Sequence, residues 1–351
     1  MSNPDGFHKG RGAVSNRNGR YCAATVIPEE DAPRPDPATV FYRETAKSII
    51  TRNQSPDVPF DFSINPYRGC EHGCIYCFAR PNHAYVDLSP GLDFETRIFC
   101  KDNAAERLEA RFQQRGYQAA PVTLGTATDP YQPVETSRLI TRRLLEVLLR
   151  YRHPFSLITK SSLVLRDLDL LEEAAGYGLV NVMISVTTLD NDLKTRLEPR
   201  TASGAARLRA VSALTARGIP VGVLMAPVIP WINDGEIESV VERSAEAGAE
   251  SANFILLRLP LEVAPLFEEW LAVHYPERAQ RVLNALRNSR GGKLYDARFG
   301  ARMRGTGAMA ELYGNRFRSA CRRAGIQHGG SRELRSDQFS LPNKNRQLGL
   351  F

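Results

Sequence analysis

The chain has 351 residues, of which 42% are hydrophobic and 24% charged, so most of it can bury a core in one large domain or two. No stretch of about 18 apolar residues occurs and the N-terminus lacks the apolar core of a secretion signal, which predicts a cytoplasmic protein with no membrane segment. Six cysteines are too few for a disulfide framework, and the net charge of +7 suits a phosphate-rich partner without requiring one.

The first 258 residues divide into a polar lead and a periodic region. Residues 1–38 are rich in Gly, Asn, Pro and Arg and predict a flexible basic lead and linker. From residue 39 to 258, short apolar runs alternate with stretches of helical spacing. The predicted strands are 61–68, 121–128, 155–160, 180–188, 219–227 and 251–259. The predicted helices are 103–115, 136–152, 165–177, 203–217 and 235–247. This α/β alternation indicates parallel strands covered by helices, and six units predict a partial (β/α)6 barrel of the TIM type.

The alternation ends beyond residue 258. Residues 261–288, interrupted by Pro265 and Pro276, and residues 306–323 have helical spacing, so a helical C-terminal extension is predicted over 259–330. Residues 331–351 are polar and predict a flexible tail.

Three of the six cysteines lie within eight positions. The stretch CEHGCIYC places Cys70, Cys74 and Cys77 directly after the first predicted strand. Thiolates hold iron-sulfur clusters, and three of them can take three irons of a 4Fe-4S cube and leave the fourth iron open. A structural zinc ion would need a fourth protein ligand, for which the candidates are His72, His83 and Cys100. The zinc site and a chance cluster of buried free cysteines both remain alternatives.

The CxxxCxxC spacing, with Tyr76 before the last cysteine, resembles the cluster-binding loop of the radical S-adenosylmethionine (SAM) superfamily. Within it, SINPYRGCEHGCIYCFARP and TATDPYQPVE are similar to the branch that includes spore photoproduct lyase and its DNA-photolyase-like relatives. The resemblance covers about residues 39–258. It implies a partial barrel with a 4Fe-4S cluster at the C-terminal ends of the strands and SAM on the open iron. It also implies reductive cleavage of SAM to a 5′-deoxyadenosyl radical that takes hydrogen from a substrate, with an electron donor such as flavodoxin or ferredoxin.

Side chains at the ends of the predicted strands are candidates for contacts with SAM, because barrels gather their sites there. Thr126, Thr128 and Asp129 could meet the ammonium group or the ribose, although Thr and Asp also make turns. Lys160 could pair with the SAM carboxylate, as a matching lysine does in the lyase-like branch, or lie at the surface.

The fourth strand and the cluster loop add further candidates. Ser185 ends the strand, and Arg200 in the following loop could clamp a carboxylate or only fix the loop. The Tyr76 ring could stack on adenine or pack in the core. Hydrogen bonds to the cluster sulfurs, or purely structural roles, are open to Asn65, Arg68 and Arg80. No catalytic residue can be assigned.

The second strand end departs from the lyase pattern. Spore photoproduct lyase has a motif that resembles Cys-Thr-Ser-Asp at this position, and its cysteine donates hydrogen to the repaired thymine. Here the stretch reads Thr126-Ala127-Thr128-Asp129, and a hydroxyl cannot donate a hydrogen atom as a thiol does. Thymine-dimer reversal by the same route is therefore not expected, and the resemblance leaves the substrate open.

Two C-terminal segments suggest a nucleic-acid setting. The final residues, QLGLF (347–351), resemble the short peptide that binds the DNA sliding clamp, and QFSLP (338–342) is a poorer candidate. Either segment could instead be an ordinary tail. Residues 298–323 mix Arg with aromatic residues, as phosphate-tracking surfaces and solvated helix faces both do. The leading prediction is a radical SAM enzyme in nucleic-acid repair or modification. A protein or small-molecule substrate, or a non-catalytic metal-cluster protein docking on DNA, are the alternatives.

Overall fold

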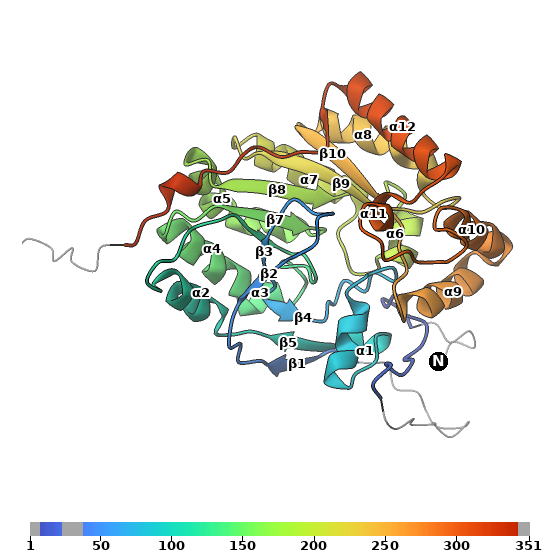
Figure 1. Ribbon diagram of the computed structural model, residues 1–351, viewed down its shortest axis with the longest axis horizontal. Coiled ribbons are helices and arrows are strands. Elements are labelled where there is room, and N and C mark those ends of the chain that lie inside the picture. Colours follow the sequence, from blue (N-terminus) through green and yellow to red (C-terminus); the bar gives the residue numbers. More distant parts are fainter. Residues whose placement is uncertain (1–7, 23–37, 343–351) are drawn as a thin grey trace, which may run out of the picture.

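The computed structural model describes residues 8–22 and 38–342, which are organised around one large sheet (Figure 1). Its strands follow the order β11-β10-β9-β8-β7-β6-β3-β2. All neighbouring strands are parallel except β2, which pairs antiparallel with β3 at one edge. Their bounds are β2 (Ile50–Arg52), β3 (Phe62–Ile64), β6 (Val122–Leu124), β7 (Phe155–Thr159), β8 (Val180–Ser185), β9 (Val221–Val228), β10 (Ser251–Leu256) and β11 (Gln327–His328). The chain thus has a mixed α/β fold with a parallel sheet, consistent with the predicted partial barrel.

Helices follow the strands where the apolar spacing predicted them, with slightly shorter bounds. They are α2 (Ala104–Phe112), α3 (Glu135–Arg138), α4 (Ile140–Arg150), α5 (Leu168–Gly176), α7 (Gly204–Thr215) and α8 (Ile237–Glu246). In α4, Ile140, Leu144 and Leu148 share the buried face, and each such side chain contributes about 1.5–3 kcal/mol of burial free energy. Figure 1 shows α4, α5, α7 and α8 along the outer side of the sheet. Because these helices cover the outer side of the sheet, the ends of the strands remain available for a site.

A second, smaller sheet was not predicted. It has the order β1-β5-β4, with β1 (Val40–Arg43), β4 (Tyr67–Arg68) and β5 (Arg97–Cys100). The predicted strand 61–68 divides between the two sheets at Asn65-Pro66, because Pro66 has no N–H with which to continue a ladder. The cysteine loop therefore starts from the small sheet, beside the C-terminal end of β3.

The predicted C-terminal extension is helical. Its helices are α9 (Val263–His274), α10 (Pro276–Asn288), α11 (Ala301–Arg304) and α12 (Ala308–Ala324). Pro265 does not interrupt α9, because it lies in the first turn, where the missing N–H has no helical partner; Pro276 begins α10 for the same reason. Helix α12 packs against α8, and α9 to α11 lie beyond one end of the strands (Figure 1). None of the helices in the described ranges has the length and apolarity needed to cross a bilayer.

The described parts of both tails pack on the domain, which differs from the predicted flexible termini. Phe339 contacts the rings of Phe112 and Tyr151, and the Ser340 N–H donates to the Tyr151 carbonyl at 3.0 Å. Phe339 is the aromatic residue of QFSLP, so this segment is already in use within the chain. QLGLF and residues 23–37 lie outside the described residues.

Candidate functional site

The cysteine loop is fixed by backbone hydrogen bonds on several sides. The Cys70 N–H donates to the Phe94 carbonyl at 2.9 Å, and the Ile75 N–H donates to the Leu197 carbonyl at 3.2 Å. The Cys77 N–H closes a turn on the Cys74 carbonyl at 3.2 Å. A loop with its polar backbone paired in this way holds its side chains in defined positions, as a metal site requires.

Arg80 also fixes the cysteine loop. Its fully buried guanidinium donates to the Cys74 carbonyl at 2.9 Å, to the Gly73 carbonyl at 3.2 Å and to the Glu95 carboxylate. Five planar N–H donors suit several carbonyls at once. Arg80 therefore has the structural role that the sequence left open, and it is committed to the backbone of the cluster loop.

One cavity of about 630 Å³ joins this loop to the strand ends. Its lining includes all three clustered cysteines and six of the seven predicted SAM-binding residues: Tyr76, Thr126, Thr128, Asp129, Lys160 and Ser185. Arg200 is not among the lining residues. Its N–H donates to the His72 carbonyl at 3.3 Å, and its guanidinium lies 3.3 Å from Glu71. Arg200 therefore ties two loops together, and its contact with SAM stays a prediction.

The donor chemistry of the cavity suits an iron-sulfur cluster. Three sulfur donors from one loop line one space, as a cube with one open iron needs. Two of the three zinc candidates lie elsewhere: Cys100 is buried in the core, and His83 contacts the Arg97 carbonyl at 3.0 Å. The third, His72, lines the same cavity as the cysteines and faces Asp129 at 3.3 Å, so a zinc site remains the alternative to the cluster.

The electrostatics around the thiols are mixed. Burial raises the pKa of Cys70, and burial together with the Glu198 carboxylate raises the pKa of Cys74. The positive charges of Lys160 and Arg207 oppose the shift at Cys74. Because a thiol must lose its proton to bind a metal, loading of this site is expected to release protons.

The three predicted residues after β6 are already occupied with local structure. The Thr126 hydroxyl is 3.1 Å from the amide nitrogen of Asn65, and the Thr128 hydroxyl donates to the Tyr67 carbonyl at 3.0 Å. Asp129 accepts from the Thr159 hydroxyl at 2.7 Å and faces His72 at 3.3 Å. Burial opposes its ionisation, but His72, Thr159 and the Lys160 N–H lower the pKa of Asp129 to about 2. These residues build the wall of the cavity.

Lys160, Tyr76 and Ser185 have more freedom to meet a ligand. The Lys160 ammonium lies 5.9 Å from the centre of the Tyr76 ring, and within the described part of the chain no carboxylate lies within 4 Å of it. The Ser185 carbonyl accepts a hydrogen bond from Arg207 at 2.9 Å, and Ser185 is one of the residues that line the cavity. A cation, a ring and a hydroxyl around one space can bind an amino-acid carboxylate and a nucleoside.

The sequence reasoning missed a buried network behind Tyr76. Glu198 accepts hydrogen bonds from the Tyr76 hydroxyl, from Thr187 at 2.7 Å and from Arg207, and none of these side chains is more than slightly exposed. Burial opposes its ionisation, yet the charges of Arg207 and Lys160 and the two hydroxyls lower the pKa of Glu198 to about 2. No sequence pattern marks Glu198 beyond its place in the segment LEPRT (197–201), because a buried carboxylate has no sequence signature of its own.

The N-terminal segment 8–22 crosses the cluster loop. The N–H groups of Gly12 and Ala13 donate to the Glu95 carboxylate at 2.9 and 2.8 Å. A Cβ at Gly12 would lie 1.8 Å from the Gly73 carbonyl, so only glycine permits this approach. Ser15 donates to Glu269 of α9 at 2.6 Å, so the segment links the cluster loop to the C-terminal extension.

Glu95→Gln should loosen this N-terminal segment. One acceptor oxygen is lost, and local opening at residues 12 and 13 should become easier by about 1–3 kcal/mol. The buried guanidinium of Arg80 also loses its charged partner, which should cost the whole domain about 3–5 kcal/mol, although Arg80 keeps its backbone carbonyl partners. Hydrogen exchange by mass spectrometry on the full chain measures the effect.

The matched control is Glu269→Gln in α9, whose carboxylate pairs with the half-exposed Arg17 of the same segment, and it should cost about 0–1 kcal/mol. Equal protection of residues 8–22 in the native chain and in Glu95→Gln would contradict the assigned role of Glu95.

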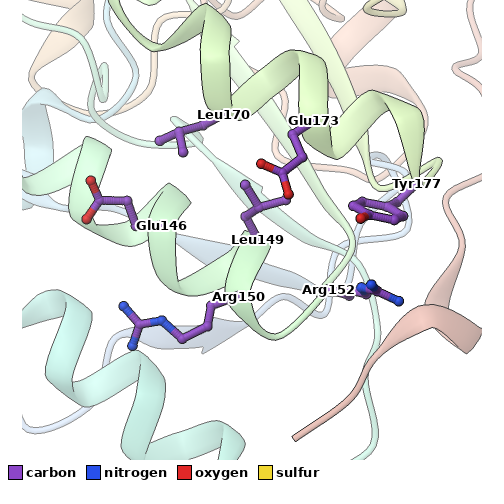
Figure 2. Close-up of a pocket in the computed structure, with 7 residues that line it drawn as sticks. All are labelled: Glu146, Leu149, Arg150, Arg152, Leu170, Glu173 and Tyr177. Carbon is purple, nitrogen blue, oxygen red and sulfur yellow. The ribbon is translucent and has the colours of Figure 1, made fainter. Parts of the chain in front are cut away.

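A second cavity, of about 460 Å³, lies between α4 and α5 on the outside of the barrel. Figure 2 shows its lining side chains, with Leu149 and Leu170 between the charged groups. Arg152 stacks on the Tyr177 ring at 4.5 Å, and Arg150 pairs with Glu109 at 3.3 Å. This cavity has no cysteine or histidine in its lining, so the strand-end cavity is the candidate functional site.

Comparison with known proteins bears on the identity of this site. An uncharacterized protein of Mycobacterium tuberculosis is 36% identical over 255 residues, covering 71% of this chain and 74% of the relative. An uncharacterized protein of Methanocaldococcus jannaschii is 25% identical over 240 residues, covering 68% and 85%. Spore photoproduct lyase complexed with dinucleoside spore photoproduct has a TM-score of 0.59 at 15% identity, covering 82% of this chain and 81% of that one. At this identity the last likeness shows a shared fold.

The family assignment comes from the sequence itself. The model of the Radical SAM superfamily matches residues 64–243, slightly more than half of the chain. That range contains the three clustered cysteines and every strand-end residue of the cavity from Thr126 to Ser185. The cysteine loop, the cavity and the family match agree, and the chain is therefore a radical SAM enzyme, a member of the radical SAM superfamily.

Proposed function

We propose that this enzyme binds a 4Fe-4S cluster through Cys70, Cys74 and Cys77, cleaves SAM reductively and takes a hydrogen atom from a nucleic-acid substrate. The observation that carries the proposal is that these thiols share one cavity with Tyr76 and Lys160. The bound cluster and SAM would supply the electron and the 5′-deoxyadenosyl radical. The chain must hold both and keep water away from the reacting atoms.

Lys160 would bind the SAM carboxylate, because its ammonium faces the cavity beside Tyr76 without a carboxylate partner among the described residues. The Tyr76 ring would pack against the nucleoside, held in place by its hydroxyl on Glu198. Ser185 would donate or accept one hydrogen bond. Thr126, Thr128 and Asp129 would shape the wall, as their internal hydrogen bonds indicate.

Apolar side chains complete the cavity. Ala127, Ile158, Leu224 and Leu257 line it between the polar strand ends. Such a lining has no proton donor or acceptor side chain and lowers the local water content, which protects a reactive carbon radical from side reactions. It also strengthens the charge interactions of Lys160.

The hydrogen chemistry should differ from that of spore photoproduct lyase. Among the described residues that line the cavity, Cys70, Cys74 and Cys77 are the only thiols, and the proposed cluster uses all three. Thr126 stands at the second strand end and hydrogen-bonds Asn65. We therefore propose a reaction in which no protein thiol at this position returns hydrogen to the product.

The nucleic-acid part of the proposal rests on charge, and the structure changes which charges support it. Within residues 298–323, four of the seven arginines form ion pairs: Arg298 with Asp296, Arg302 with Asp57, Arg316 with Glu238 and Arg323 with Glu242. This stretch is therefore partly a solvated, paired face. The net charge of +7 and the unpaired cations of the cavity are the stronger support.

The test is anaerobic reconstitution of the full chain with iron and sulfide, followed by reduction with dithionite and SAM. About four irons per chain and formation of 5′-deoxyadenosine are expected. Lys160→Met should raise the KM for SAM about tenfold, which corresponds to the loss of one charge-assisted hydrogen bond. Its iron content should equal that of the native chain.

The outcome also separates the alternatives. Iron and sulfide with no cleavage of SAM would indicate a metal-cluster protein that docks on DNA without catalysis. Cleavage of SAM together with no binding to DNA or RNA at low salt would favour a protein or small-molecule substrate.

The proposed partners are an electron donor of the flavodoxin or ferredoxin type and the DNA sliding clamp. The clamp peptide QLGLF lies outside the described residues, so its role stays a prediction. Removal of residues 347–351 should abolish clamp binding in a titration if the prediction is right. The thiolate chemistry suits the reducing cytoplasm.

A further inference from the structure

Arg258, just after β10, has an unusual environment for a largely buried arginine. Its guanidinium stacks on the Phe78 ring at 4.2 Å and lines the strand-end cavity. It forms no hydrogen bond or ion pair with the described residues. Burial lowers the pKa of Arg258, and the cost of that burial is not offset by any carboxylate in contact.

The other buried arginines donate several hydrogen bonds to the chain, although the Nε of Arg290 has no partner among the described residues. Arg80 donates to backbone carbonyls and Glu95, and Arg207 donates to Glu198 and the Ser185 carbonyl. Arg290 donates to the Leu257 carbonyl and to the Arg302 carbonyl at 3.0 Å. Arg258 instead lines the cavity without such partners among the described residues, so its donors are available to a ligand.

Apart from the three cysteines, whose thiolate charges the irons of the proposed cluster would largely neutralise, the charge of the cavity lining is one-sided. Its cations are Arg52, Lys160, Arg258 and Arg302, and its one carboxylate among the described residues is Asp129. Both oxygens of Asp129 are already hydrogen-bonded, to Thr159 and to the Lys160 N–H. Arg302 is paired with Asp57, which leaves Lys160 and Arg258 as the inner cations without an acidic partner. A cavity of this kind favours a ligand with more than one negative group.

These two cations come from strands that are not neighbours. Lys160 follows β7 and Arg258 follows β10, and β8 and β9 lie between them. Three strand spacings amount to about 14 Å along the sheet. If Lys160 binds the SAM carboxylate, Arg258 is left for an anionic group of the substrate.

Aromatic rings accompany the arginines at the rim. Phe78, which follows the last cluster cysteine, is 44% exposed although it lines the cavity. Phe299 is 59% exposed and has the Arg302 guanidinium 4.7 Å above its ring. Exposed rings beside guanidinium groups are the means by which proteins bind single-stranded nucleic acid, since bases stack on the rings and phosphates meet the charges. The two features together favour a nucleotide over a simple anion.

We propose that Arg258 and Phe78 form the substrate-binding pair of this enzyme, with Arg258 on a phosphate and Phe78 against a base of a single-stranded or flipped-out nucleotide. The inference rests on the proposed function and deepens it by naming the residues and the strand state. A base within a duplex could not reach a recessed cavity, so an unpaired nucleotide is required. The shared chemistry, a phosphate next to a base, belongs to DNA and RNA alike.

The experiment measures binding of the reconstituted full chain to a fluorescein-labelled ten-nucleotide single strand, as DNA and as RNA, with the DNA duplex as a third arm. Fluorescence anisotropy is followed from 50 to 200 mM salt. Arg258→Gln should weaken single-strand binding about tenfold and lower the slope of log K against log salt by about 0.7. Phe78→Ala should weaken binding about fivefold or more at an unchanged slope, because it removes stacking only.

The matched control is Arg298→Gln, which removes the same charge from a 76% exposed side chain outside the cavity lining. Its slope and affinity should stay within about twofold of native. Circular dichroism and iron content confirm that each variant is folded and loaded. Stronger binding of the DNA or of the RNA strand identifies the substrate polymer, and either supports the pair.

The inference is overturned if Arg258→Gln binds like the native chain or if Arg298→Gln loses as much. Duplex binding that weakens in Arg258→Gln would indicate a flipped-out nucleotide and support the pair, whereas duplex binding as tight as that of the single strand and independent of Arg258 would overturn it. A native chain that cleaves SAM but binds no oligonucleotide would overturn the inference and leave the radical chemistry standing. Binding that depends on Arg258 without cleavage of SAM would support the pair and contradict the proposed reaction.

Discussion

Replacing Cys74 with alanine should abolish SAM cleavage and leave the chain folded. Cys74 comes from the middle of the loop, and its carbonyl is held by Arg80 whatever its side chain. A cube bound by only Cys70 and Cys77 would have two unprotected irons and would be lost or degraded. The iron content should fall well below that of the native chain, and 5′-deoxyadenosine should drop to the level of the chain without iron.

The matched control is Cys321→Ala. Cys321 is equally buried, but it lies in α12 against the core and does not line the cavity. Its loss should cost about 1 kcal/mol of stability and leave iron content and cleavage unchanged. Full iron content and cleavage in Cys74→Ala would show that another residue takes its place and would refute the ligand assignment.

Glu198→Gln should destabilise the chain by about 3–5 kcal/mol at neutral pH. The substitution leaves the buried guanidinium of Arg207 without its counter-charge, and breaking a buried pair from one side is costly. It also removes the charged acceptor of the Tyr76 hydroxyl, so the cluster loop should open more readily. Urea unfolding of native and variant chains measures the difference.

The same carboxylate predicts a specific pH dependence. Arg207 and Lys160 lower the pKa of Glu198 from 4.5 to about 2 against the opposing effect of burial. A carboxyl with a lowered pKa stabilises the folded chain above its unfolded pKa and loses this contribution as the pH falls toward the folded value. The native chain should therefore lose about 3 kcal/mol from this group between pH 4.5 and 2, and Glu198→Gln should lack that part of the loss.

Glu172→Gln is the control for Glu198→Gln. Glu172 pairs with Arg217 at 2.7 Å, but both side chains are about half exposed, so the substitution should cost about 0–1 kcal/mol. A loss in Glu198→Gln no larger than in Glu172→Gln would mean that the buried pair contributes nothing. In the double variant Glu198→Leu/Arg207→Met the cost should be smaller than in Glu198→Gln, because no buried charge is left alone.

Local patterns predicted much of the barrel. The apolar runs that became β8 and β9 are largely buried on both faces, whereas β7 alternates between buried and half-buried residues, and the length of all three runs is visible along the chain. The helices between them end close to glycines such as Gly218, whose φ of +70° continues no helix. Both signals act over a few residues, which is why they could be interpreted without the fold. The small sheet β1-β5-β4 escaped because its strands have two to four residues and their partners lie far away along the chain.

The residues of the candidate site were likewise predictable only in part. CEHGCIYC sets the three thiols by sequence spacing alone, and the strand ends set Lys160 and Ser185 by the rule that parallel strands present their C-terminal ends on one side. The local partner of Arg200, three residues beyond α6 (Asn191–Leu197), could not be predicted, because Glu71 lies 129 residues away in the chain. Glu95, Glu198 and Arg258 could not be found, since their partners are up to 180 residues distant.

The sequence by itself determined the chemical class, because cluster ligands must be close together in space and here they are close together in the chain. It also determined the order of strands and helices, because burial periodicity is local. Tertiary structure alone decided which charges remain unpaired. The seven arginines of residues 298–323 looked alike in the sequence, yet carboxylates neutralise four of them. Arg258 lies outside that stretch, lines the cavity and stacks on the Phe78 ring. Whether a charge is free for a substrate depends on neighbours brought in by folding, and these neighbours are set by the packing of distant segments.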